Sequence, residues 1–136
     1  MAMEKQFSIF VQNKAGSLST ICTCLAERGI NVRAVSVIDD LEWGIVRLIS
    51  EDPEGTRAVL QDLDMMYGEN QVLTVQVANH PGALAQLAET LAEENINIEQ
   101  AYATAIGPKT ILVLSTTDDQ KAEAALTAKP GRTDQP

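Results

Sequence analysis

Apolar residues occupy every second position in two stretches of the chain. The first stretch runs from Phe7 to Val11 and the second from Leu73 to Val77. A period of two is typical of a strand that packs one face on a hydrophobic core and leaves the other face to polar residues. The pattern therefore predicts one strand near the start of the chain and another in its second half.

Each predicted strand is followed by apolar residues at helical spacing. These are Leu18, Ile21, Cys22 and Leu25 in the first case, and Leu84, Leu87, Ala88, Leu91 and Ala92 in the second. Stripes of this kind predict a helix that packs on the preceding strand. Gly29 and Asn95 follow the stripes, and both residue types tolerate the positive φ with which many helices end.

Two more apolar runs in each half predict a hairpin. Their ranges are 30–38 with 45–49, and 96–103 with 110–114. The connections at 39–42 and 105–108 are short and turn-like, as in a hairpin. A second helix follows each hairpin: Asp52 and Pro53 supply an N-cap and a first-turn proline, and Asp118 or Asp119 caps the counterpart.

The two halves are copies of one another. Residues 6–60 align with 72–126 at an offset of 66, without a gap, and 14 of the 55 pairs are identical. Average composition would give roughly one match in fifteen. The identities fall at core and turn positions, which indicates structural duplication. They are Val11/Val77, Asn13/Asn79, Gly16/Gly82, Leu18/Leu84, Leu25/Leu91, Ala26/Ala92, Glu27/Glu93, Ile30/Ile96, Asn31/Asn97, Ile45/Ile111, Leu48/Leu114, Asp52/Asp118, Ala58/Ala124 and Leu60/Leu126.

The order of elements predicts an α+β fold of two ferredoxin-like βαββαβ modules, at residues 1–70 and 71–136. The last strand of the first module is short, at 65–67. In the second module the equivalent stretch, 127–136, is expected to be a flexible tail. The second module then lacks its last strand, and the resulting sheet edge is one that another chain could cover.

Composition restricts the classes of function. The net charge is -9 and the pI about 4.4, which disfavours binding to nucleic acid and to acidic membrane surfaces. No apolar run reaches the roughly 20 residues of a membrane span, and the first residues lack the apolar stretch of a signal peptide. We expect a cytoplasmic protein.

The chain offers little for metal or covalent chemistry. Cys22 and Cys24 are its only cysteines and His80 its only histidine. A Cys/His metal site would need more ligands, and no Ser/His/Asp or Cys/His set or phosphate loop stands at a motif. We therefore expect no metal, no cofactor and no catalytic activity.

A motif opens the first helix of each copy. The second copy has Asn79-His80-Pro81-Gly82-Ala83-Leu84 and then Ile96-Asn97-Ile98, and the first has Asn13-Lys14-Ala15-Gly16-Ser17-Leu18 and then Ile30-Asn31-Val32. Over residues 6 to 126 this pattern resembles the ACT domain, a ligand-sensing βαββαβ module of regulators of amino-acid metabolism. The resemblance implies two modules side by side in an eight-stranded sheet, with helices on one face. It also implies an amino acid bound where the first loop of one module meets its neighbour.

The loop residues support a binding site on physical grounds as well. A glycine lets a ligand approach the backbone, and the helix that follows presents unpaired N–H groups to a carboxylate. The carbonyl oxygens of Asn13 and Asn79 suit an ammonium group. The alternative is that Gly16 and Gly82 serve tight turns only, and that both asparagines cap helices. Some amino-acid-sensing members have a histidine where this chain has valine, so the resemblance does not transfer the identity of the ligand.

The predicted ligand-binding residues come from both loops and from the second strand of each copy. They are Asn13, Lys14, Ala15, Gly16, Ser17, Leu18, Asn31, Asn79, His80, Pro81, Gly82, Ala83, Leu84 and Asn97. Asn31 and Asn97 could instead form turns after the helices. Trp43 and Gly44 are candidates either for a pocket wall or for core or dimer packing.

These observations predict a regulatory sensor that binds a small molecule, namely an amino acid, and acts through ligand-dependent association of modules or subunits. A homodimer is expected, and its partner would be a regulated enzyme or another regulator. The alternative is an assembly module that docks a protein partner without a ligand.

Overall fold

The computed structural model describes residues 1–12, 15–40, 42–106 and 108–128. Six strands and four helices alternate along this part of the chain. They are β1 (Ala2–Gln12), α1 (Ser17–Glu27), β2 (Val32–Asp40), β3 (Trp43–Ser50), α2 (Pro53–Asp62), β4 (Met66–Ala78), α3 (Ala83–Glu93), β5 (Ile98–Ile106), β6 (Lys109–Thr116) and α4 (Asp119–Thr127).

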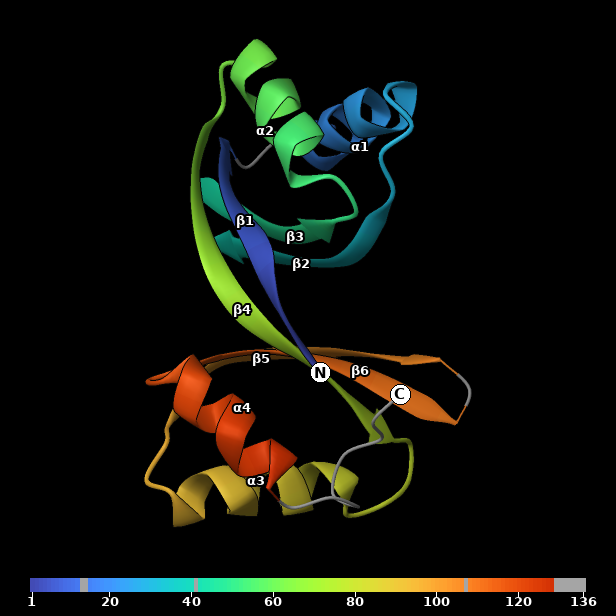
Figure 1. The fold of residues 1–136 in the computed structure, drawn as a ribbon. Coiled ribbons are helices and arrows are strands. Elements are labelled where there is room, and N and C mark those ends of the chain that lie inside the picture. Colours follow the sequence, from blue (N-terminus) through green and yellow to red (C-terminus); the bar gives the residue numbers. More distant parts are fainter. Residues whose placement is uncertain (13–14, 41, 107, 129–136) are drawn as a thin grey trace. The chain divides into compact units, whose positions relative to one another are not determined.

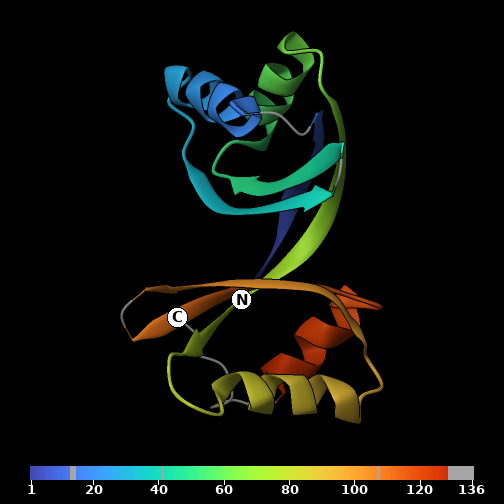
Figure 2. The same cartoon turned by 180° about the vertical axis from the view of Figure 1, so that it is seen from behind.

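The contacts of the chain define two compact units. The first unit comprises residues 5–70, and the second unit comprises residues 1–4 with 71–136. The hydrogen-bonded strands follow the order β2-β3-β1-β4-β6-β5. In each unit two helices cover one face of the strands, as Figures 1 and 2 show from opposite sides. The predicted α+β class, with two duplicated ferredoxin-like modules and helices on one face, is confirmed.

The strands number six rather than the eight that the resemblance implied, because two of them each serve both units. The sequence suggested a short strand at 65–67 and a new one near residue 71. The structure instead has one continuous strand, β4, that contains Gly68 and Asn70. Residues 66–70 of β4 belong to one unit and residues 71–78 to the other. β1 is divided in the same way after Glu4.

Residues 1–4 occupy the sheet edge that the sequence analysis left empty in the second module. The Thr74 hydroxyl donates to the Ala2 carbonyl oxygen at 3.3 Å and to the Glu4 carboxylate at 2.5 Å. Met1 and Met3 pack against the buried cluster of this unit. The sequence alone assigns these residues to the first module, because they adjoin it in the chain. Of the expected tail, residues 129–136 lie outside the described residues.

The hairpins are tighter than the sequence suggested. In the first hairpin Val37 pairs with Val46 and Asp40 with Trp43. In the second, Ile106 pairs with Lys109. Only two residues therefore separate the strands of each pair, and the turn residues expected at 39–40 and 105–106 are the last residues of strands.

The helix ends follow the predicted chemistry. The Asp52 side chain accepts from the Gly55 backbone N–H at 3.0 Å, and Pro53 begins α2. Asp118 rather than Asp119 caps α4, accepting from the Lys121 backbone N–H at 3.0 Å. Gly29 and Asn95 have positive φ of 69° and 57° after α1 and α3. These caps and stops are confirmed.

The central leucine and isoleucine positions of the helical stripes are buried, whereas Cys22 and Ala92 of the predicted stripes are exposed. Ile21 and Leu25 of α1, like Leu87 and Leu91 of α3, are fully buried. The leucines that begin the two stripes, Leu18 and Leu84, are 37% and 57% exposed. Their place in the apolar stripe predicted burial, but both side chains lie at the edge of the core, in the first turn of their helices.

A carboxylate of the first unit should make stability depend on pH. Arg57 donates two hydrogen bonds to Glu69, at 2.8 and 2.7 Å, and Lys5 lies 3.4 Å away. The hydrogen bonds from Arg57, followed by those from Lys5, lower the pKa of Glu69 from 4.5 to about 2. A carboxyl whose folded-state pKa is lowered stabilises the fold above its unfolded-state pKa, and this contribution disappears as the pH falls.

We therefore expect Glu69→Gln to lower the free energy of unfolding at pH 7 by on the order of 1 kcal/mol, the scale of a partly screened pair. The variant should also lose part of the stability change between pH 4.5 and 2. Urea titrations at several pH values measure both effects. Asp62→Asn, which removes the more exposed pair with Arg28, is the control and should change stability by less. If the free energies of unfolding of Glu69→Gln and of the wild type change in parallel with pH, Glu69 does not contribute to the pH dependence of stability.

Candidate functional site

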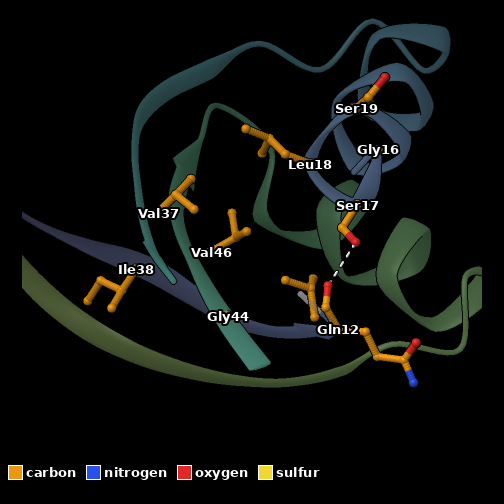
Figure 3. Close-up of a pocket in the computed structure, with 10 residues that line it drawn as sticks. Gln12, Gly16, Ser17, Leu18, Ser19, Val37, Ile38, Gly44 and Val46 are labelled. Atoms are coloured by element: carbon orange, nitrogen blue, oxygen red, sulfur yellow. Dashed lines mark hydrogen bonds between the residues drawn. The ribbon is translucent and has the colours of Figure 1, made fainter. Parts of the chain in front are cut away.

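The unit of residues 5–70 contains a cavity of about 230 Å³. It lies where the end of β1 and the first turn of α1 meet the β2–β3 hairpin. Figure 3 shows Leu18, Val37 and Val46 around this space, with Ser17 near Gln12. The lining residues are Val11, Gln12, Gly16, Ser17, Leu18, Ser19, Val37, Ile38, Gly44 and Val46.

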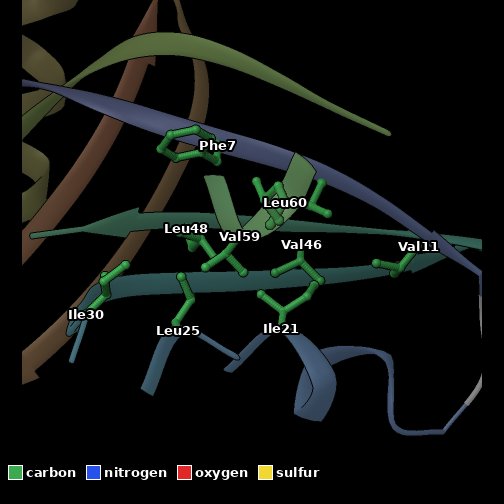
Figure 4. Packing of buried hydrophobic residues seen from close by; sticks show 10 residues of the cluster. Phe7, Val11, Ile21, Leu25, Ile30, Val46, Leu48, Val59 and Leu60 are labelled. Atoms are coloured by element: carbon green, nitrogen blue, oxygen red, sulfur yellow. The ribbon is translucent and has the colours of Figure 1, made fainter. Parts of the chain in front are cut away.

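The inner wall of the cavity belongs to the hydrophobic core. Val11 and Val46 are part of the buried cluster of this unit (Figure 4). Val37 pairs with Val46 across the hairpin but is itself 53% exposed. The wall is therefore rigid on its inner side and open to solvent along β2.

The other side of the cavity is the beginning of α1. Gly16 is the N-cap residue, with φ of 92°, a left-handed conformation that glycine adopts without strain. The Ser17 hydroxyl donates to the Gln12 carbonyl oxygen at 3.1 Å, which ties the helix start to the end of β1. The N-cap has no side chain to receive hydrogen bonds from the first turn. This turn can therefore offer backbone N–H groups, such as that of Ser19, to an anion.

The equivalent loop of the second unit has the same N-cap conformation, with φ of 89° at Gly82. Its backbone is held by local hydrogen bonds. The Asn79 N–H donates to the Pro108 carbonyl oxygen at 2.7 Å, and the His80 N–H donates to the Ala78 carbonyl oxygen at 3.1 Å. The Nδ1 atom of His80 lies 2.9 Å from the carbonyl oxygen of Pro81.

The two residues that follow Gly82 differ in exposure. Ala83, at the place of Ser17, is buried, whereas Leu84 is exposed. The second loop thus presents one apolar side chain and a helix N-terminus to solvent, without the serine hydroxyl of the first loop.

Asn31 and Asn97 lie away from the loops. The Asn31 side chain donates to the Glu51 carboxylate at 3.3 Å. The Asn97 backbone N–H donates to the Thr117 hydroxyl at 3.1 Å. Both asparagines precede the first residues of β2 and β5, while the cavity lies near the end of β2. The structure therefore does not bring Asn31 to the cavity, since six strand residues span roughly 20 Å.

Among the predicted site residues, the structure brings Gly16, Ser17 and Leu18 together around the cavity. Ala15 is exposed beside them. Asn13 and Lys14 lie outside the described residues. The sequence analysis did not find the walls contributed by the strands, which are Val11, Gln12, Val37, Ile38 and Val46, or Ser19 on the helix. A hairpin register built on a two-residue turn would have placed Val37 opposite Val46.

Gly44 was a sequence candidate for a pocket wall, and it does line the cavity. Its neighbour Trp43 is 54% exposed and is not among the described lining residues. The two residues point to opposite faces of β3, because successive side chains of a strand alternate.

The cavity is uncharged in the part of the chain that the structure describes, since none of its lining residues there has an ionisable side chain. Cys22 and Cys24 are free thiols on α1. No group of three or more histidine, cysteine, aspartate or glutamate residues suited to a metal ion occurs among the described residues. None of the described helices is long and apolar enough to cross a membrane. The uncharged cavity, lined largely by apolar side chains, suits binding of a small, mainly apolar molecule.

The model of one protein family, described as an ACT domain pair, matches residues 1–130. The chain belongs to this family. No curated protein matches it. The family match covers both copies, and the resemblance seen in the two loop motifs is confirmed.

Solved structures share the fold of this ACT domain pair. Protein BT0572 from Bacteroides thetaiotaomicron is 30% identical, with a TM-score of 0.91 over 97% of this chain and 90% of that one. The ligand-free regulatory subunit of aspartate kinase from Thermus thermophilus is 18% identical, with a TM-score of 0.69 over 93% and 92%. The regulatory subunit from Thermus flavus is 19% identical, with a TM-score of 0.64 over 93% and 92%. At these lower identities the two kinase subunits show the fold alone.

Proposed function

We propose that this ACT domain pair is a regulatory sensor that binds an amino acid at its β1–α1 loops and catalyses no reaction. The ligand would change how modules or subunits associate, and an enzyme or regulator would respond to that change. A homodimer is the simplest assembly for this mechanism. Such coupling needs only that the ligand bind one arrangement more tightly than another.

The observation that carries the proposal is the open cavity beside the N-terminus of α1. An amino acid has a carboxylate, which suits the uncapped first turn after Gly16, and a side chain, which suits an apolar space. The matching backbone conformation at Gly82 makes the second loop a further candidate for the carboxylate. The regulatory subunits of aspartate kinase share this fold, which is consistent with a regulatory role.

A second candidate is an assembly module that docks a protein without a ligand. One observation favours it. Phe10, Ile38 and Trp43 are exposed apolar side chains of the first unit. Phe10 and Ile38 both pair with Ile45, so their side chains lie on the same face of the sheet, and Trp43 lies there too because it is two residues from Ile45. This face is opposite the helices. Exposed apolar patches often mark protein interaction sites.

A thermal-shift screen of the twenty amino acids on the intact chain separates the two candidates. A ligand at about 100 times its dissociation constant should stabilise the native state by roughly 2.7 kcal/mol. We expect at least one amino acid to raise the melting temperature in this way. Sedimentation velocity with and without that amino acid then measures the expected change in association. An absence of any shift at millimolar concentrations would favour the assembly module.

A further inference from the structure

The cavity of the first unit can also be compared with the equivalent place in the second. At the 66-residue offset, Gly44 corresponds to Thr110 and Val46 to Leu112. Both positions face the core side of their strands, because Gly44 pairs with Val11 and Thr110 with Val77. The second copy thus has larger side chains at these two positions, but smaller ones on the neighbouring strand, because Val37 corresponds to Ala103 and Ile38 to Thr104.

Gly44 is the residue on which this difference depends most. A Cβ atom at position 44 would lie 3.2 Å from the Ile38 carbonyl oxygen and 3.4 Å from the Val11 Cγ2 atom. Any side chain there would therefore occupy space against the valine wall of the cavity. The polar rim differs too, because Ser17 corresponds to Ala83.

The shape and chemistry of the cavity limit its occupant. Its volume of about 230 Å³ is below the roughly 300–1,000 Å³ of pockets that hold drug-sized ligands. Three valines, a leucine and an isoleucine are the large apolar residues among its described lining residues, none of which is ionisable. A ligand with a charged side chain would lose hydration there without gaining an ionic partner, which is costly. The polar lining residues are Gln12 at the end of β1 and Ser17 and Ser19 in the first turn of α1.

From these observations we infer that the pocket of the first copy selects an α-amino acid with a short, branched aliphatic side chain. The carboxylate lies against the first turn of α1, and the side chain packs between Leu18, Val37 and Val46. This inference rests on the proposed function and specifies its ligand class.

Val37 and Val35 provide a matched pair for testing the inference. Both lie on β2 and are about half exposed, at 53% and 47%. They also lie on the same face of the strand, because they are two residues apart. Only Val37 is among the described residues that line the cavity. A glutamate at either position should be tolerated by the fold, but only Val37→Glu would place a carboxylate beside the bound ligand.

Isothermal titration calorimetry of the intact protein with leucine, isoleucine, valine, serine, lysine and aspartate tests the inference. We expect the three aliphatic amino acids to bind at least tenfold more tightly than lysine or aspartate. Val37→Glu should weaken binding at least tenfold, and Val35→Glu should change it less than twofold. Circular dichroism confirms that both variants are folded. Gly44→Thr, which introduces the residue of the second copy, should also weaken binding.

The outcomes separate this inference from the proposed function. A preference for a charged amino acid, or equal effects of Val37→Glu and Val35→Glu, would overturn the inference. The proposed function would survive each of these results, because an amino acid still binds. If none of the twenty amino acids binds, both the inference and the proposed function fail.

Discussion

Removing Ala2–Glu4 should destabilise the unit that contains β5 and β6, although these residues are distant from it in sequence. The deletion eliminates the strand segment beside β4, the two hydrogen bonds of the Thr74 hydroxyl, and the packing of Met3 on the core. Loss of one buried methionine side chain alone typically costs about 2–5 kcal/mol, and Met3 is only partly buried. Including the lost backbone pairing, we expect a decrease of roughly 2–5 kcal/mol in the free energy of unfolding, measured by urea titration followed by circular dichroism.

The position of the effect can be measured by hydrogen exchange. Amides of β4 in residues 71–78 should lose protection, because the deletion exposes this edge of the strand to solvent. A conservative change at the exposed Ala2, to serine, is the control and should alter stability by no more than about 0.5 kcal/mol. A deletion variant as stable as the wild type would show that residues 2–4 do not stabilise this unit.

The sequence contained enough information for most of the fold but not for this segment. Helices and hairpins depend on local patterns, such as the alternation in β1 and the caps at Asp52 and Asp118. The place of residues 2–4 depends on pairing with a strand about 70 residues away, for which no local pattern exists. The sequence also divided β4 at residue 70, whereas the strand continues through Gly68 and Asn70, because pairing with neighbouring strands overrides the local preference of these residues for turns.

The candidate site shows the same division. Gly16 and Ser17 were found from the sequence because a glycine at a helix start has a local cause, the need for positive φ. Val37 and Val46 were not, because they come together only through the register of the hairpin. Asn31 matched a family motif, but its side-chain amide bonds to Glu51 near the start of β2, whereas the cavity lies near the end of that strand. Proximity in a motif therefore did not imply proximity in space.

Residues that look alike in a helical stripe can also differ widely in what they contribute to stability. Leu84 and Leu87 lie one turn apart on α3, and both belong to the stripe that predicted this helix. Leu87 is fully buried, whereas Leu84 is 57% exposed in the first turn. Burial decides the cost of truncating a leucine, because the lost transfer free energy and the cavity left behind arise only in the core.

We therefore expect Leu87→Ala to lower the free energy of unfolding by about 2–5 kcal/mol, and Leu84→Ala to change it by no more than about 0.5 kcal/mol. The two variants delete the same atoms from the same helix, so helix propensity cancels in the comparison. Urea titrations of both measure the difference. Equal losses would mean that Leu84 is covered in solution, by a second subunit or by another protein. A dependence of the Leu84→Ala effect on protein concentration would then identify self-association as the cause.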